Sequence, residues 1–181
     1  PANMVLLSNL KLVLVDINPK TLNIDEDKIE NKISIKTKAI LVVHQFGHSV
    51  NMKKINNIKK KYNLKVIEDN AESIGGKYNN KLNGTMSDLS TLSFFANKII
   101  TTGEGGAILT NNKKLYERCL EMRDHGMDKN KKYFHKYLGF NYRMTNLQAA
   151  IGLSQIREIK SILKKRRHQM TYYYKLLSNN K

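Results

Sequence analysis

The sequence predicts an α/β fold built around a mostly parallel sheet. Largely apolar runs at residues 10–16, 39–44 and 64–69 lack a regular polar alternation, which is typical of strands buried on both faces. Stretches with a helical spacing of apolar residues, at 23–33 and 51–62, separate these runs. Strands that alternate with helices of this length favour a parallel sheet covered by helices on both faces.

Both predicted helices have a local basis in the sequence. The helix at 23–33, "NIDEDKIENKI", has an acidic first turn, which suits the positive end of the helix dipole. In the helix at 51–62, the side chains of Met52, Ile55 and Ile58 form one apolar stripe. We therefore expect the second helix to pack on the sheet through this stripe.

The second half of the chain is predicted to be mainly helical. Two shorter strands are expected at 89–95 and 106–110, and a helix follows at 112–126. A long amphipathic helix is expected over residues 145–177, after an aromatic and basic loop. The chain has no internal repeat and no proline-rich linker, so its composition marks no domain boundary.

The composition restricts the classes of protein to which the chain can belong. Its 181 residues carry a formal net charge of +17, but no nucleic-acid recognition motif accompanies the basic residues. We therefore expect no nucleic-acid partner, although binding with a steep salt dependence stays an alternative. No apolar run is long enough to cross a bilayer, the first residues do not resemble a signal peptide, and no membrane partner is expected. The single Cys119 excludes an internal disulfide, so a cytoplasmic location is expected.

Two polar residues lie at the ends of predicted strands. Asp69 ends the run at 64–69, and ligands of open parallel sheets bind beyond the carboxyl ends of the strands. A helix N-cap or a turn is the alternative role for an Asp at this position. Ser93 lies near the end of the strand at 89–95, where its hydroxyl can hold a phosphate group.

Lys98 follows Ser93 by five residues and precedes the stretch "TTGEGG". A lysine amine in a desolvated pocket can act as a nucleophile. The glycines allow a close approach of the backbone, although a simple turn between strands would also use them. Together with Asp69, this arrangement suits pyridoxal phosphate (PLP), with Lys98 bound to the aldehyde and Asp69 paired with the pyridine nitrogen.

Four stretches carry a resemblance to a known family: "VIEDNAESIGG", "GTMSDLSTLSFFANKIITTGEGGAILTN", "RDHG" and "GFNYRMTNLQAAIGLSQ". They resemble the DegT/DnrJ/EryC1/StrS sugar-nucleotide aminotransferases, and the likeness extends over nearly the whole chain. The resemblance implies the three-layer α/β large domain of the type I, aspartate-aminotransferase-like PLP-dependent transferases. Because family members are about twice as long, this domain is expected to be incomplete at both ends. Residues 1–150 would be its central part, and residues 151–181 a long helix leading to an absent small domain.

Within the family, the motifs are most similar to the perosamine-synthase subgroup, which aminates C4 of a GDP-linked 4-keto-6-deoxy sugar with glutamate as the donor. The resemblance thus implies a PLP-dependent aminotransferase that makes a sugar of a cell-surface polysaccharide such as O-antigen. It also implies a homodimer with shared active sites. A truncated, non-catalytic remnant or a passive dimer partner of such an enzyme stays an alternative. The nucleotide (GDP, UDP or dTDP) and the choice between C3 and C4 are left open.

The family's cofactor-binding roles fall on five residues of this chain. Lys98 corresponds to the lysine that holds PLP and moves a proton during the reaction. Asp69 corresponds to the partner of the pyridine nitrogen, and Ser93 to the residue that binds the cofactor phosphate. Glu72 would lie beside the ring, with a helix first-turn acid as its alternative role. Asn141 corresponds to a residue that reaches the phosphate of the PLP held by the other subunit.

Three further residues are expected on the substrate side of the site: Arg143, Tyr142 and His125. A structural ion pair is the alternative role of Arg143. The spacing of His125 from the earlier histidines, His44 and His48, fits no zinc pattern, so no metal site is expected.

Overall fold

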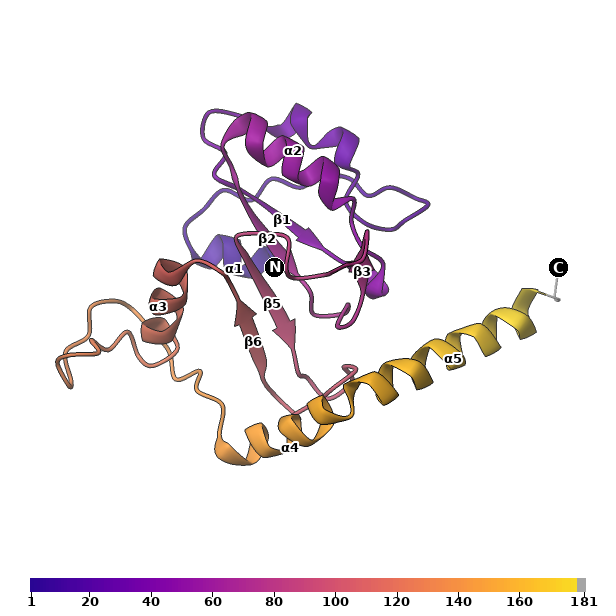
Figure 1. The fold of residues 1–181 in the computed structure, drawn as a ribbon. Helices are drawn as coiled ribbons and strands as arrows, with labels where there is room; N and C mark the ends of the chain where they lie inside the picture. The colour runs from indigo at the N-terminus through magenta and orange to yellow at the C-terminus, as the bar shows by residue number, and fades with distance from the viewer. Residues whose placement is uncertain (179–181) are drawn as a thin grey trace. The chain divides into compact units, whose positions relative to one another are not determined.

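The computed structural model describes residues 1–178 of the chain (Figure 1). The chain divides into two units. The first unit comprises Pro1–Ser93 and Gly106–Arg143, and it contains the main sheet. The second unit comprises Phe94–Gly105 and Met144–Lys181, a loop followed by helices. This division differs from the boundary near residue 150 expected from the sequence, and the domain assignment itself stays a prediction.

The main sheet has four strands in the order β1-β2-β5-β6. β1 pairs with β2 and β2 with β5 in parallel, whereas β6 runs antiparallel to β5. The prediction of a mostly parallel sheet is confirmed, and the antiparallel edge strand is an addition to it. The bounds of the strands are Ala39–Val43 for β1, Lys65–Asp69 for β2, Leu89–Ser93 for β5 and Gly106–Leu109 for β6.

Strands β1 and β2 end at the same level of the sheet, and β5 continues for two more residues to Ser93. Val43, the last residue of β1, pairs with Asp69, the last residue of β2, and Asp69 pairs with Thr91 of β5. The carboxyl ends of the strands therefore meet at one edge, which is where ligands of open α/β sheets bind.

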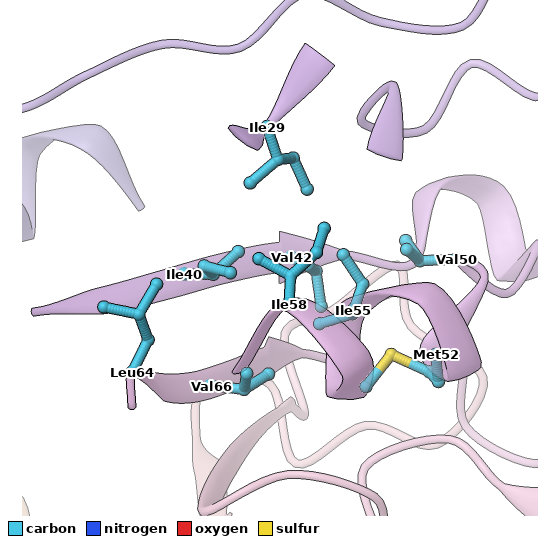
Figure 2. Close-up of a cluster of buried hydrophobic side chains, with 9 residues drawn as sticks. All are labelled: Ile29, Ile40, Val42, Val50, Met52, Ile55, Ile58, Leu64 and Val66. Carbon is cyan, nitrogen blue, oxygen red and sulfur yellow. The ribbon is translucent and has the colours of Figure 1, made fainter. Parts of the chain in front are cut away.

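Helix α2 (Met52–Tyr62) packs on one face of β1 and β2 and forms the core. Asn51 caps its first turn by accepting a hydrogen bond from the Lys54 backbone, and Asn63 ends it in the left-handed conformation at φ 51°. Each fully buried aliphatic side chain in this cluster contributes about 1.5–3 kcal/mol of hydrophobic free energy. Figure 2 shows the cluster: Ile29, Ile40, Val42, Val50, Met52, Ile55, Ile58, Leu64 and Val66.

Two elements at the start of the chain differ from the prediction. Residues 10–16 belong to no helix or strand of the described chain, and the nearest pairing is the single bridge between Ile17 and Ile24. The strand prediction was wrong because apolar character alone does not supply a neighbouring strand edge. In place of one helix at 23–33, two 3₁₀ turns flank the buried Ile29: η1 (Glu26–Lys28) and η2 (Glu30–Lys32).

The long C-terminal helix predicted for residues 145–177 is two helices. Thr145 begins the first with a capping box, in which its side chain and that of Gln148 bond each other's backbone N–H. The chain leaves helical geometry at Glu158, which ends the first helix. The remaining helices and strands are α1 (Ala2–Leu7), η3 (Gln45–Gly47), β3 (Lys77–Tyr78), β4 (Lys81–Leu82), α3 (Lys113–Met122), α4 (Asn146–Arg157) and α5 (Ile159–Ser178).

Among residues 1–178, none of the helices combines the length and the apolar character that crossing a bilayer requires.

Candidate active site

Asp69 lies at the carboxyl end of β2, on the face of the sheet that α2 does not cover. Side chains alternate along a strand, and Val66 and Glu68 point into the buried face, so Asp69 points to the other. Its carboxylate Oδ1 accepts a hydrogen bond from the backbone N–H of Ala71 at 3.1 Å. A turn rather than a helix follows Asp69, so Asp69 is not a helix N-cap, and its contact with Ala71 lies within this turn. Asp69 remains half-buried.

Ser93 lies on the same face of the sheet as Asp69. Asp69 pairs with Thr91 on the neighbouring strand, and Ser93 follows Thr91 by two residues, which restores the same orientation. Strand spacing and rise put the two Cα atoms roughly 8 Å apart. The first unit thus brings a carboxylate and a hydroxyl, both predicted site residues, onto one surface at the strand ends.

Glu72 is anchored to the loop that follows β1. Its Oε2 accepts a hydrogen bond from the backbone N–H of Phe46 at 3.1 Å. Phe46 has a left-handed backbone, with φ 52°, and 72% of its surface is exposed. Glu72 itself lies in a turn, so its alternative role as a helix first-turn acid was wrong. The carboxylate is therefore held close to the ends of β1 and β2.

A buried pair, His44 and Glu68, lies beneath these strand ends, and both side chains are fully buried. The His44 Nδ1 accepts a hydrogen bond from the Val50 N–H at 3.1 Å, which assigns the ring proton to Nε2. Nε2 then donates to Glu68 Oε2 at 2.9 Å. The backbone N–H groups of Gly84 and Met86 donate to the same carboxylate at 2.8 and 2.9 Å.

These contacts determine the ionisation of Glu68. Burial alone would raise the pKa of the Glu68 carboxyl, but the hydrogen bonds from His44, Ser87 and the backbone outweigh it and lower the pKa below its usual value. The carboxylate stays ionised and ties β1, β2 and the loop after β4 together. We did not predict this role for Glu68. Its place next to Asp69 at the end of a buried strand could have indicated it, because neighbouring strand residues face opposite sides of the sheet.

Lys98 belongs to the second unit, in the loop 94–105, and it is half-buried. Its backbone N–H donates to the Phe95 carbonyl at 3.0 Å, which forms a tight turn. The base of this turn is closed by the Thr102 N–H, which donates to the Phe94 carbonyl at 2.9 Å. The lysine is therefore presented on a hydrogen-bonded turn rather than on a strand or helix.

Asn141 and Tyr142 lie in an exposed loop of the first unit that follows α3. The loop folds back on the end of α3, because the Tyr142 N–H donates to the Arg123 carbonyl at 2.9 Å and Asn141 forms a bridge with Asp124. The ring of Tyr142 stacks on that of Phe140, with centroids 4.9 Å apart. Both residues therefore occupy defined positions despite their exposure.

Arg143 and His125 meet at one acidic side chain, that of Asp124. The Arg143 Nη1 lies 3.4 Å from Asp124 Oδ2, and the His125 Nδ1 lies 3.4 Å from Oδ1. The structural ion pair foreseen for Arg143 is present, yet 63% of its side chain stays exposed. The structure thus brings the predicted substrate-side residues together in one loop of the first unit.

Within the described residues, no three His, Cys, Asp or Glu side chains are grouped in a way that could hold a metal ion.

Comparison with protein families yields a match along the whole chain. A sequence profile described as the DegT/DnrJ/EryC1/StrS aminotransferase family matches residues 1–181.

Among curated proteins, GDP-perosamine synthases are similar to this chain. The protein of Escherichia coli O157:H7 is 45% identical over 167 residues, which cover 92% of this chain and 46% of that protein. The protein of Caulobacter vibrioides is 45% identical over 177 residues, which cover 98% and 48%, respectively. The chain therefore spans about half the length of the curated relatives it matches.

Solved structures share the fold. Helicobacter pylori PseC, an aminotransferase involved in the biosynthesis of pseudoaminic acid, superimposes with a TM-score of 0.91 at 36% identity, over 96% of this chain and 47% of that one. A GDP-4-keto-6-deoxymannose-3-dehydratase with a trapped PLP-glutamate geminal diamine gives a TM-score of 0.89 at 31% identity, over 94% and 49%. The predicted fold class and the resemblance to the perosamine-synthase subgroup are confirmed.

Proposed function

Because this chain belongs to the DegT/DnrJ/EryC1/StrS aminotransferase family, we propose that the protein is a PLP-dependent aminotransferase acting on a nucleotide-linked 4-keto-6-deoxy sugar. The similarity to two GDP-perosamine synthases supports this class of substrate. The solved relative that holds PLP and glutamate supports glutamate as the amino donor. The product would enter a cell-surface polysaccharide such as O-antigen, and the reaction would take place in the cytoplasm.

The observation that carries the proposal is the shared orientation of Asp69 and Ser93 at the carboxyl edge of the sheet. A carboxylate suits the protonated pyridine nitrogen of PLP, and a hydroxyl suits its phosphate. The two side chains are on neighbouring strands, roughly 8 Å apart between Cα atoms, which leaves room for a ring between them. The residues present therefore fit this cofactor.

Each cofactor-binding residue would have a distinct task. When bound, PLP would supply an aldehyde that receives the amino group and a ring that delocalises the electron pair released at the reacting carbon. Lys98 would hold the cofactor through Nζ and then take a proton from the donor carbon and return it. Asp69 would keep the ring nitrogen protonated, Ser93 would donate its hydroxyl to the phosphate, and Glu72 would lie beside the ring.

The exposed loop after α3 would serve the substrate and a second copy of the chain. We expect Asn141 to reach the cofactor phosphate of the partner in a homodimer with shared active sites. Arg143, Tyr142 and His125 would contact the nucleotide-linked sugar. Arg143 suits a diphosphate, because its guanidinium donates several hydrogen bonds from one plane and most of its side chain is exposed.

The proposal is tested by covalent attachment of the cofactor. The purified chain is incubated with PLP, reduced with borohydride and mapped by mass spectrometry, beside Lys98→Ala and the matched variant Lys165→Ala on α5. We expect the reduced cofactor on Lys98 of the parent and of Lys165→Ala, and none at position 98 of Lys98→Ala. Amination assays with glutamate and GDP-, UDP- and dTDP-linked keto sugars then identify the nucleotide.

Scattered labelling, or none, would contradict the formation of the site by this chain. It would favour the alternative of a non-catalytic remnant or a passive dimer partner.

A further inference from the structure

Helix α4 holds Thr101, in the loop that carries Lys98, through the side-chain amide of Gln155. The Gln155 Oε1 accepts a hydrogen bond from the Thr101 N–H at 3.0 Å, and the Gln155 Nε2 donates to the Thr101 carbonyl at 2.6 Å. The second proton of Nε2 goes to the Ile151 carbonyl at 3.0 Å. One carboxamide therefore satisfies both backbone groups of Thr101, which fixes its position and its orientation.

Thr101 is fixed from the loop side as well. Its Oγ1 donates to the Phe94 carbonyl at 3.1 Å and accepts from the Gly103 N–H at 3.0 Å. Thr101 lies in an irregular segment, so the amide of Gln155 takes the place that a neighbouring strand would have in a sheet. The end of the turn thus depends on a contact from a helix that starts more than forty residues later in the chain.

Lys98 lies three residues before Thr101, and a trans chain of that length spans at most roughly 11 Å. The turn between them is closed at its base by the bond from Thr102 to Phe94. A displacement of Thr101 can therefore be transmitted through this short turn to the backbone of Lys98. Near-attack geometry tolerates little such movement, because a shift of about 1 Å can cost on the order of 100-fold in rate.

The surface of α4 allows the loop 94–105 to approach closely. Gly152 faces the buried Thr102, and a Cβ at position 152 would lie only 2.9 Å from its Cγ2 methyl. Gln148, two turns before Gln155, donates through Nε2 to the Glu104 carbonyl at 3.1 Å. Two amides with a glycine between them thus present one helix face to the backbone of the loop.

We propose that Gln155 is a positioning residue for Lys98: by holding both backbone groups of Thr101, it sets the place from which the Lys98 amine meets the cofactor. The inference rests on the proposed function, because it assigns the purpose of the contact to cofactor attachment. Gln155 does not itself touch the reacting atoms and acts through Thr101.

The test compares Gln155→Met with Gln169→Met. Methionine keeps the length and the helix propensity of glutamine but neither donates nor accepts as an amide does. Gln169 is exposed on α5, so its variant controls for the chemical change. Two quantities are measured on the full chain: amide hydrogen exchange of residues 94–105 without cofactor, and the rate at which PLP becomes reducible onto Lys98.

We expect Gln155→Met to exchange its Thr101 amide about tenfold faster than the parent, as the loss of a hydrogen bond of about 1.4 kcal/mol would allow. Labelling of Lys98 should slow by at least about tenfold. Gln169→Met should match the parent in both measurements. Gln155→Glu keeps the acceptor for the Thr101 N–H but loses the donor when ionised, so its exchange and labelling should lie between those of the parent and Gln155→Met.

Each of the other outcomes would overturn a specific part of the inference. Unchanged exchange in Gln155→Met would overturn the contact itself. Faster exchange with undiminished labelling would overturn the positioning role, because a merely structural contact would give that result. Absence of label on Lys98 in the parent would overturn the proposed function and the assignment that rests on it, whereas labelling of the parent and of Gln155→Met at equal rates overturns the inference alone.

Discussion

Glu68 and Asp69 are neighbours in the sequence, yet they face opposite sides of the sheet. Alternation along β2 sends Glu68 into the buried network with His44 and leaves Asp69 half-buried on the face it shares with Ser93. At the residue scale, one acid holds the strand ends together and the next is available for a ligand. Substitutions at the two positions should therefore have different effects.

Glu68→Gln should lower the free energy of unfolding by about 2–3 kcal/mol, because it removes the charge from hydrogen bonds that reach a fully buried carboxylate. The new amide also directs N–H protons at donors of the backbone. Urea denaturation measures the change, and Glu104→Gln, at an exposed position, should leave the midpoint almost unchanged. A variant at position 68 as stable as the parent would contradict the role of the network.

The same carboxylate predicts how stability depends on pH. The pKa of Glu68 is lowered in the folded state, so the folded chain binds fewer protons than the unfolded chain as the pH falls below about 4.3, the usual Glu value. Its contribution to stability is present above that value and is lost as the pH falls through the lowered pKa. Glu68→Gln should therefore show a shallower loss of stability in acid than the parent.

At the scale of the element, α2 and the paired strands form the most regular part of the molecule. The apolar stripe of the helix packs on Ile40 and Val42 of β1 and on Val66 of β2 (Figure 2). Ile55→Ala should cost about 2–5 kcal/mol, since its side chain is fully buried and truncation leaves a cavity. Chemical denaturation checks this against Ile35→Ala, where 96% of the residue is exposed and little change is expected.

The elements that the sequence predicted well are those with local signals. The stripe of α2 and the strands β1, β2 and β5 follow from periodicity and apolar runs. The run at 10–16 has the same local character but forms no ladder in the described chain, because strand pairing depends on a partner distant in the sequence. The antiparallel direction of β6 and the break at Glu158 likewise depend on packing rather than on local composition.

In the candidate site, too, some residues have a local signal in the sequence and others depend on distant contacts. Motifs predicted Lys98, Asp69 and Ser93, and the shared face of the last two follows from strand register. The contacts of Glu68 and Gln155 depend on backbone groups 16 and 54 residues away, respectively. No sequence motif predicts such distant pairs. Local patterns thus suffice to propose residues for the chemistry, but not to find the residues that hold them in place.

For the whole molecule, the proposal of shared active sites has a direct consequence. If Lys98 of one copy and Asn141 of the other serve the same cofactor, then Lys98→Ala and Asn141→Ala complement each other when mixed. Each mixed dimer would contain one site with both native residues. Neither variant alone would contain such a site.

Random mixing at equal amounts should raise labelling of Lys98 to about one quarter of the parent's level, because half of the dimers are mixed and one site in each is native. The measurement is PLP attachment after the two variants have exchanged subunits, with each variant alone as the control. Labelling equal to the average of the separate variants would contradict shared sites.

The loop 94–105 leaves and returns to the sheet at a single rung, the pair formed by Ser93 of β5 and Gly106 of β6. The next contact, from the Phe94 N–H to the Gly105 carbonyl at 2.9 Å, continues this pairing by one step. Residues added to or removed from the middle of the loop therefore leave the register of every strand unchanged. Insertions or deletions in this segment should therefore change the surroundings of Lys98 and leave the pairing of β5 with β6 intact.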